Sequence, residues 1–226
     1  MSAHDTQTTS SAVEDYAKAI YKLQDAGEAT VTTNAIAECL EVTPASASQM
    51  VKRLGSMGLV VHEPYRGVSL TAAGVRVALE VLRHHRLLEL YLTESLGVSW
   101  DRVHDEAEVL EHVLSEELEA EIDRVLGYPA TDPHGDPIPT ADLVIAAEPT
   151  HRMAQLEPGQ AAVVRQVPDG DPTLLQYLAG LGLVPDTRFT MLDKAPFGGP
   201  LTLDVGGTQQ AVGVELAERI RVEVTA

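Results

Sequence analysis

This sequence is short of cysteine, of aromatic residues and of positive charge. Among its 226 residues it has one cysteine, Cys39, one tryptophan and two phenylalanines. A single cysteine excludes an internal disulfide framework and fits a reducing cytoplasm, and the apolar pattern AIAECL around it predicts a buried thiol. No apolar run reaches the roughly 18 residues of a membrane span, and the polar, acidic start lacks the features of a secretory signal. We therefore expect a cytoplasmic protein with no membrane partner.

Positive charge is outnumbered two to one, by 34 Asp and Glu to 16 Lys and Arg, which gives a net charge of −18. Such a surface repels phosphate and argues at first against nucleic acid. The acid is unevenly spread, however: residues 1–76 carry a net of −2, residues 77–140 a net of −11 and residues 141–226 a net of −5. The middle of the chain is therefore either a cation site or a solvated helical face.

Two catalytic signatures are also absent. The sequence has no H-E-x-x-H, which excludes the zinc-protease motif, and we find no nucleophile placed beside a general base. A metal-dependent hydrolase is therefore the less favoured interpretation of the acidic segment 77–140.

The first third of the chain has the pattern of a winged helix-turn-helix. Apolar spacings of three and four predict the helices, Thr43 is a good N-cap with Pro44 as first helical residue, and a β-hairpin follows. Helix, short helix, turn, helix and hairpin is the order of a DNA-binding domain of this type. The expected ranges are 12–26, 31–41 and 44–54 for the helices and 59–71 for the hairpin.

The middle of the chain predicts two long helices, and the end predicts a small β domain. Residues 71–97 are helical in pattern, with a possible break near Gly74, and residues 99–127 continue as one helix after a Ser cap. Residues 128–143 are rich in Pro and Asp and predict a loop, whereas from about residue 153 short β runs predict a barrel-like domain. The second helix carries an apolar stripe wide enough for a subunit contact: Val103, Ala107, Leu110, Leu114, Leu118, Ile122 and Leu126.

The segment VHDEAEVLEH, residues 103–112, concentrates ligating side chains on that second helix. At 100° per residue, two imidazoles and two carboxylates share an arc of about 100°, whereas Asp105 and Glu106 point elsewhere and should be solvated. The preceding helix offers an imidazole and a carboxylate four residues apart, and so on one face. Neutral imidazole and carboxylate oxygens suit borderline to hard divalent ions. The sequence therefore favours a metal site made by His104, Glu108, Glu111, His112, His85 and Glu89.

These blocks also carry a resemblance to a known family. EDYAKAIYKL, VTPASASQMVKRL followed by GLV, YRGVSLTAAG, HHRLLELYL, VHDEAEVLEH and GDPIP occur in the order found in the diphtheria toxin repressor family of metal-dependent transcriptional regulators. The resemblance covers nearly the whole chain. It implies a homodimeric repressor of metal-homeostasis genes that binds palindromic double-stranded DNA operators when metal is bound, and it implies no organic ligand.

The resemblance implies a mainly α protein with a small β domain. Its parts are a winged helix-turn-helix DNA-binding domain, a helical domain for dimerisation and metal binding, a linker and a C-terminal SH3-like β-barrel of the FeoA kind. In this sequence they correspond to residues 1–74, 75–140, 141–152 and 153–226.

The resemblance further implies two metal sites per subunit. The first draws on Asp15 from the first helix and on Glu108, Glu111 and His112. The second draws on His85, Glu89 and His104, with two ligands from the SH3-like domain that fall at Gln166 and Asp169.

Positions at which this sequence differs from the family pattern indicate which metal ion it binds. Iron-responsive members carry Met at the position of Asp15 and Cys at that of Glu108, so oxygen replaces both soft sulfur ligands here. Oxygen donors suit Mn(II), with Fe(II) on the same scaffold as the alternative. Lys18 stands where manganese regulators carry a further acid, which argues against a binuclear cluster of their type.

Nine residues are candidates for DNA contact. Short hydroxyl and amide side chains near the start of the recognition helix suit phosphates and base edges, with Gln49 as the best base reader. Basic and tyrosine side chains on that helix and on the wing suit phosphates, and their small number predicts modest non-specific affinity. The candidates are Thr43, Pro44, Ser46, Ser48, Gln49, Lys52, Arg53, Tyr65 and Arg66.

Overall fold

The computed structural model describes residues 10–25, 27, 30–63, 66–145 and 151–225, which fall into two compact units. The first unit holds the described residues up to His84 together with Pro139–Val144, and the second holds His85–Ile138 and the described residues from Ile145 on. Helix α4 (Ala72–Leu96) contributes residues to both units. No helix in the described part of the chain has the length and apolar character needed to cross a lipid bilayer.

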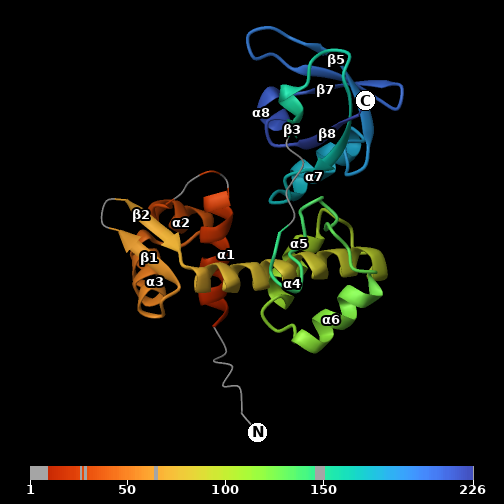
Figure 1. Ribbon diagram of the computed structural model, residues 1–226. Helices are drawn as coiled ribbons and strands as arrows, with labels where there is room; N and C mark the ends of the chain where they lie inside the picture. Colours follow the sequence, from red (N-terminus) through yellow and green to blue (C-terminus); the bar gives the residue numbers. More distant parts are fainter. Residues whose placement is uncertain (1–9, 26, 28–29, 64–65, 146–150, 226) are drawn as a thin grey trace. The chain divides into compact units, whose positions relative to one another are not determined.

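The first unit is built as the winged helix-turn-helix that the sequence predicts (Figure 1). Its elements are α1 (Ser11–Asp25), α2 (Thr33–Cys39), α3 (Pro44–Ser56), β1 (Val60–Glu63) and β2 (Gly67–Leu70). The hydroxyl oxygens of Thr32 and Thr43 accept from the backbone of Ala35 and Ser46, which satisfies donors that a helix start leaves free. β1 and β2 pair antiparallel.

The core of this unit forms from the apolar positions of all three helices and the hairpin. Ile20, Ile36, Leu54 and Val68 are fully buried in it. The expected burial of Cys39 is wrong, since its side chain is exposed. Cys39 is the last residue of a short helix and lies about 200° around its axis from buried Ala37, so it faces away from the core.

The helical part of the second unit differs from the expectation of one continuous helix over 99–127. Two helices form instead, α5 (Val103–Leu110) and α6 (Glu116–Val125). The Ser115 hydroxyl accepts from Leu118 N and caps the start of α6 as a separate helix. The apolar residues predicted to form one stripe therefore do not share one helix face. Val103, Ala107 and Ile122 are buried, whereas Leu118 is exposed.

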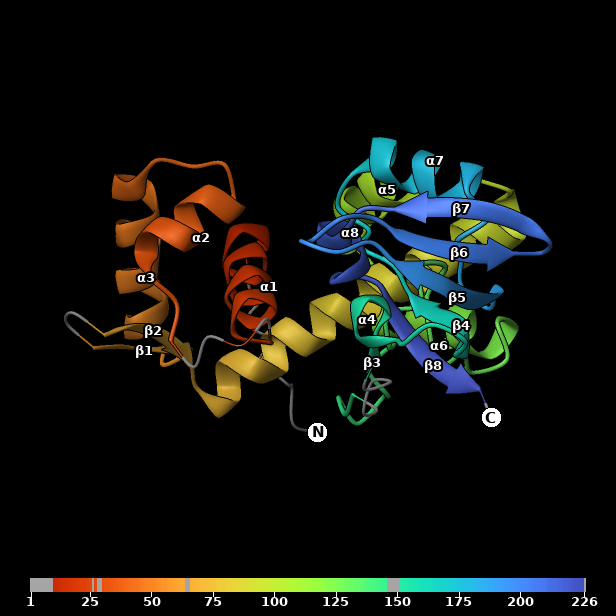
Figure 2. The ribbon, with the colours of Figure 1, turned by 90° about the horizontal axis from the view of Figure 1, so that it is seen from above.

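The C-terminal part is a six-stranded antiparallel sheet with hydrogen-bonded order β3-β8-β4-β5-β6-β7 (Figure 2), which confirms the predicted β domain. Its apolar core includes Val164, Met191, Leu203 and Val222, and Trp100 from the helical part packs against it. The elements are β3 (His151–Arg152), η1 (Met153–Gln155), β4 (Ala161–Gln166), α7 (Pro172–Gly180), β5 (Arg188–Lys194), β6 (Leu201–Val205), β7 (Thr208–Val212), α8 (Val214–Ala217) and β8 (Arg221–Thr225).

Helix α4 is unbroken, and Gly74 has a packing role in its first turn rather than acting as a breaker. A Cβ atom at this position would lie 2.1 Å from the carbonyl oxygen of Leu59, so only glycine lets the two backbones approach this closely. The Thr71 hydroxyl accepts from Gly74 N and fixes the same turn.

Replacing Gly74 with alanine is expected to destabilise the first unit by about 1 to 3 kcal/mol, because the added methyl overpacks a backbone contact. Thermal unfolding followed by circular dichroism measures the effect. Gly55→Ala is the matched control: it lies in α3 with nothing within 4 Å of the new Cβ, and alanine favours helix. Equal midpoints for the two variants would contradict the constraint at Gly74.

Candidate metal centre

The ligating side chains of the second unit come from two helices. His85 and Glu89 stand one turn apart on α4 and are buried, and His104 and Glu108 stand one turn apart on α5 and are half-buried. The i, i+4 spacing aims each pair in one direction, as the sequence predicts. Other acidic positions of α5, at 105 and 106, are exposed as expected.

Three of these side chains converge on one point. His85 Nε2 lies 3.1 Å from Glu89 Oε1 and 3.0 Å from His104 Nδ1. His104 Nδ1 in turn lies 3.1 Å from Glu89 Oε1. The structure therefore brings His85, Glu89 and His104 together, as predicted for the second metal site.

A further carboxylate sets the tautomer of His85. Its Nδ1 lies 2.5 Å from Glu111 Oε2, and a carboxylate is an acceptor, so Nδ1–H is the donor. In the neutral imidazole this leaves a lone pair on Nε2, which faces Glu89 and His104. A carboxylate that accepts from the distal nitrogen of a histidine is the usual partner of a metal-bound imidazole.

The spacing of the three atoms fits a divalent cation. Two bonds of about 2.1 Å at right angles place their ligand atoms about 3.0 Å apart, which is the spacing found here. Two imidazoles and one carboxylate on one face of an octahedron leave three positions for further ligands. His85, Glu89 and His104 are the residues that would hold the ion.

Burial would raise the pKa of Glu89, yet the side chains of His104, His134 and His85 hold it well below its usual value. The carboxylate is fully buried and negatively charged. It is therefore a ligand that needs no proton removed before it binds a cation.

The residues predicted for the first site lie in both units. Glu111 is buried at the C-terminal end of α5, where its second carboxylate oxygen lies 3.4 Å from His112 Nε2. Glu108 Oε1 lies 3.6 Å from His104 Nε2 and 3.9 Å from His85 Nδ1. Asp15 lies on α1, in the first unit.

The two ligands assigned to the β domain have different surroundings. Asp169, in the loop after β4, has a carboxylate oxygen within 4.8 Å of ligand atoms of Glu89 and His134. Gln166 turns its amide to the loop after α6, where Nε2 donates to Asp136 Oδ1 at 3.1 Å. Asp169 therefore lies beside Glu89 of the predicted second site, whereas Gln166 is hydrogen-bonded to the loop after α6.

His134 is the residue that the sequence analysis missed. It is fully buried, its ring stacks on Trp100, and its Nδ1 lies 3.8 Å from Glu89 Oε2. Burial would lower its pKa, but the charge of Glu89 and the nearby Asp132 raise it to about 9. The only signal in the sequence is a histidine between aspartates in DPHGDP, within a segment that reads as loop.

The predicted DNA-contact face lies on α3 and the wing. Gln49, Lys52 and Arg53 are exposed, as are Thr43, Pro44 and Ser46, whereas Ser48 is half-buried and donates to Pro44 O at 2.8 Å. Arg66 on the wing is exposed and pairs with Glu63 at 3.2 Å. Tyr65 lies outside the described residues.

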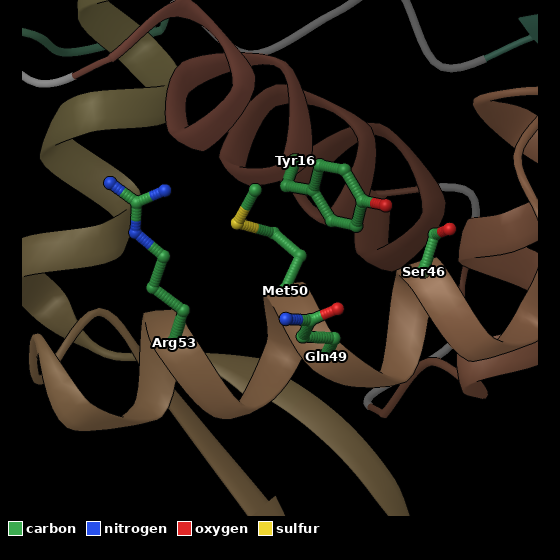
Figure 3. A pocket seen from close by; sticks show the side chains of 5 residues that line it. All are labelled: Tyr16, Ser46, Gln49, Met50 and Arg53. Carbon is green, nitrogen blue, oxygen red and sulfur yellow. The ribbon is translucent and has the colours of Figure 1, made fainter.

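A cavity of about 340 Å³ opens on the same face of the first unit (Figure 3). Tyr16 from α1 lies beside Met50 from α3, and Ser46, Gln49 and Arg53 also come from α3. Polar and cationic groups thus surround a small apolar hollow on the exposed side of α3. This arrangement can take a phosphate or the edge of a base.

Three family descriptions match the chain in succession. Residues 8–68 match "Iron dependent repressor, N-terminal DNA binding domain" and residues 71–140 match "Iron dependent repressor, metal binding and dimerisation domain". Residues 151–224 match "FeoA domain".

Similar proteins are repressors named for different metals. The iron-dependent repressor IdeR of Mycobacterium tuberculosis H37Rv is 35% identical over 222 residues, which cover 93% of this chain and 96% of the relative. The diphtheria toxin repressor of Corynebacterium efficiens is 32% identical over 220 residues, covering 93% and 94%. A solved manganese-dependent transcriptional repressor in complex with manganese is 38% identical with a TM-score of 0.87, and the match covers 94% of this chain and all of that one.

His104→Gln is expected to weaken the binding of one Mn(II) ion per subunit by at least about tenfold, because the amide replaces one of three converging ligands. Isothermal titration calorimetry on protein stripped with a chelator measures it. His62→Gln, an exposed histidine on β1, is the control and should titrate as the wild type. An unchanged isotherm for His104→Gln would rule out the three-atom cluster as an ion site.

Proposed function

This chain belongs to the diphtheria toxin repressor family of metal-dependent transcriptional repressors, and on that premise we propose that Mn(II) activates it to bind a palindromic operator as a homodimer. The family and its relatives are repressors and not enzymes, which removes the hydrolase alternative. The observation that carries the proposal is the convergence of His85, Glu89 and His104 at cation spacing.

We assign four parts to the chain: DNA binding to residues 1–74, metal binding and dimerisation to 75–140, a linker to 141–152 and the SH3-like domain to 153–226. The successive family matches over 8–68, 71–140 and 151–224 support this division. Because a repressor acts where the DNA is, we place the protein in the cytoplasm.

Two ions bind each subunit in this proposal. The first is held by Asp15, Glu108, Glu111 and His112, and the second by His85, Glu89 and His104 with help from Asp169 and Gln166. Glu111 supports both sites, since one carboxylate oxygen faces His85 and the other faces His112.

Manganese is preferred over iron because the donors are oxygen and nitrogen. Asp15 and Glu108 offer carboxylates where the iron-responsive members offer sulfur, and hard oxygen ligands suit Mn(II). The 38% identical structure is named as a manganese complex, whereas IdeR is named as iron-dependent, so Fe(II) stays the alternative ion.

The ion acts on DNA binding by coupling the two halves of the chain. Without a cation, the carboxylates of Asp15, Glu108 and Glu111 repel one another. When they share one, α1 is tied to α5, which fixes the DNA-binding domains of the dimer. Two recognition helices then enter successive major grooves about 34 Å apart. The bound charge also reduces repulsion between an acidic protein and phosphate.

Exposed apolar side chains on the helical part supply the surface for dimerisation. Val109, Val113, Leu118 and Val125 have between 54% and 76% of their surface exposed. Side chains of this kind are rarely left in water in such number without a partner. We assign the subunit contact to them in place of the buried Val103, Ala107 and Ile122.

The double substitution Asp15→Met with Glu108→Cys is expected to shift the preference from Mn(II) toward Fe(II) by about tenfold or more, because soft sulfur replaces hard oxygen. Fluorescence anisotropy measures the metal concentration that half-activates binding to an operator selected from a random duplex pool, under anaerobic conditions. Glu106→Cys, an exposed position on α5, is the control. If the wild-type protein binds the operator at full affinity after a chelator has removed the metal, metal activation is refuted.

Substitutions on α3 separate base reading from phosphate binding. Gln49→Ala is expected to cost about 1 to 3 kcal/mol on the selected operator and to relax its sequence preference. Lys52→Ala should weaken operator and random DNA alike and reduce the salt slope by about one ion. Affinity is measured by fluorescence anisotropy over a salt series. If Gln49→Ala weakens binding to operator and random DNA equally, Gln49 contacts the DNA backbone and not a base.

A further inference from the structure

The hollow between α1 and α3 is lined by hydrogen-bond donors that the protein itself does not use. Tyr16 lines it from α1 and is only 6% exposed, and within the described part of the chain its hydroxyl makes no hydrogen bond. The guanidinium of Arg53 lines the same hollow and has no ion-pair partner among the described residues. A buried hydroxyl and an unpaired cation that face one cavity indicate an anionic ligand.

The charge of the lining agrees with an anion. The five residues that line the hollow include one arginine and no acid, although the whole chain has a net charge of −18. An exposed arginine in so acidic a protein has many carboxylates to pair with, yet Arg53 pairs with none in the described part of the chain. Its donors are therefore available to a partner from outside the protein.

The hollow lies on the flank of α3 that faces α1. At 100° per residue, Ser46, Met50 and Arg53 fall within about 60° of one another around the helix axis, and Gln49 lies about 40° farther round, away from the buried side. Figure 3 shows the Tyr16 ring over this flank, with its hydroxyl toward the end at Ser46 and Arg53 at the other end. Gln49 thus faces outward, whereas the hollow opens sideways.

The flank of a recognition helix meets a different part of DNA from its outer side. A helix about 10–12 Å across fills a major groove about 12 Å wide, so its outer side faces base edges and its flanks face the groove walls. The walls are the sugar–phosphate backbone. A guanidinium and a phenol, which is protonated at neutral pH, can both donate to phosphate oxygens. Met50 and the Tyr16 ring offer apolar surface to the carbons of a deoxyribose.

We propose that this hollow binds one sugar–phosphate unit of the operator backbone, with Tyr16 and Arg53 as the phosphate donors and Met50 against the sugar. Tyr16 and Met50 were not among the sequence candidates for DNA contact, because α1 precedes the helix-turn-helix and a methionine carries no donor. The inference rests on the proposed function, since it adds a DNA contact to that repressor.

The position of Tyr16 also connects this contact to the metal. Tyr16 directly follows Asp15, which the proposed first metal site draws from α1. An ion that ties Asp15 to α5 fixes the same turn of backbone that carries the Tyr16 ring. The phosphate contact of Tyr16 therefore belongs to the metal-bound protein and contributes to the effect of metal on DNA affinity.

Tyr16→Phe tests the contact, because it removes the hydroxyl and keeps the ring. With Mn(II) present, fluorescence anisotropy is expected to show binding weakened about tenfold on the selected operator and on random DNA alike, since a phosphate contact carries no sequence information. The salt slope should stay unchanged because a phenol is uncharged, whereas Arg53→Ala should reduce it by about one ion. Tyr177→Phe, at an exposed position of α7, is the control and should bind as the wild type.

Single methylphosphonate substitutions in the operator locate the phosphate. One position in each half-site should cost the wild type about tenfold and Tyr16→Phe clearly less, because both changes remove the same hydrogen bond. Additive losses at every position would overturn the proposal. A loss in Tyr16→Phe that is confined to the operator would also overturn it, since the hydroxyl would then contact a base.

The dependence on metal is tested by repeating the measurement with a chelator. The ratio of operator affinities with and without Mn(II) should fall about tenfold in Tyr16→Phe, while calorimetry without DNA gives the wild-type Mn(II) affinity. An equal loss in both conditions would overturn the connection to Asp15. If the wild type binds the operator equally well with and without Mn(II), the proposed function fails, whereas a position-specific loss in the methylphosphonate series still supports the phosphate contact.

Discussion

The helical part of the second unit is arranged around the buried negative charge of Glu89. A carboxylate removed from water needs compensation from its neighbours. Three histidines from three different segments, His85, His104 and His134, supply it by surrounding the two oxygens. Their places on α4, on α5 and in the loop after α6 mean that the helical part closes around this group.

Contacts around the same carboxylate also reach the C-terminal sheet. His134 is held by the carbonyl of Trp100 and by the backbone of Val167, directly after β4, and Trp100 itself packs against the apolar core of the sheet. Gln166 reaches the same loop through Asp136. Trp100, His134 and Gln166 therefore connect the surroundings of Glu89 directly to the sheet.

The acidic composition, which at first argues against DNA binding, agrees with the proposed metal sites. Residues 77–140 carry a net charge of −11, and the proposed ligands Glu89, Glu108 and Glu111 belong to this range. A repressor with few basic residues binds DNA weakly when its acids are uncompensated, since phosphate contacts provide most of the non-specific affinity. In the proposed mechanism the bound cations change both the charge and the geometry, so a low DNA affinity without metal widens the difference between the metal-free and metal-bound protein.

The sequence by itself determined the local structure and the pairs of ligands. Apolar periodicity and capping residues such as Thr43 depend on neighbours in the chain, so the winged helix-turn-helix and the i, i+4 pairs of α4 and α5 could be predicted. Tertiary structure decided the break between α5 and α6, the exposure of Cys39 and the orientation of Gln166. It also decided the part played by His134, because a loop histidine has no periodicity that marks its direction. The docking of Gly135 on β4 and the contacts with Trp100 hold that ring beside Glu89, and such contacts depend on packing between segments at least 30 residues apart.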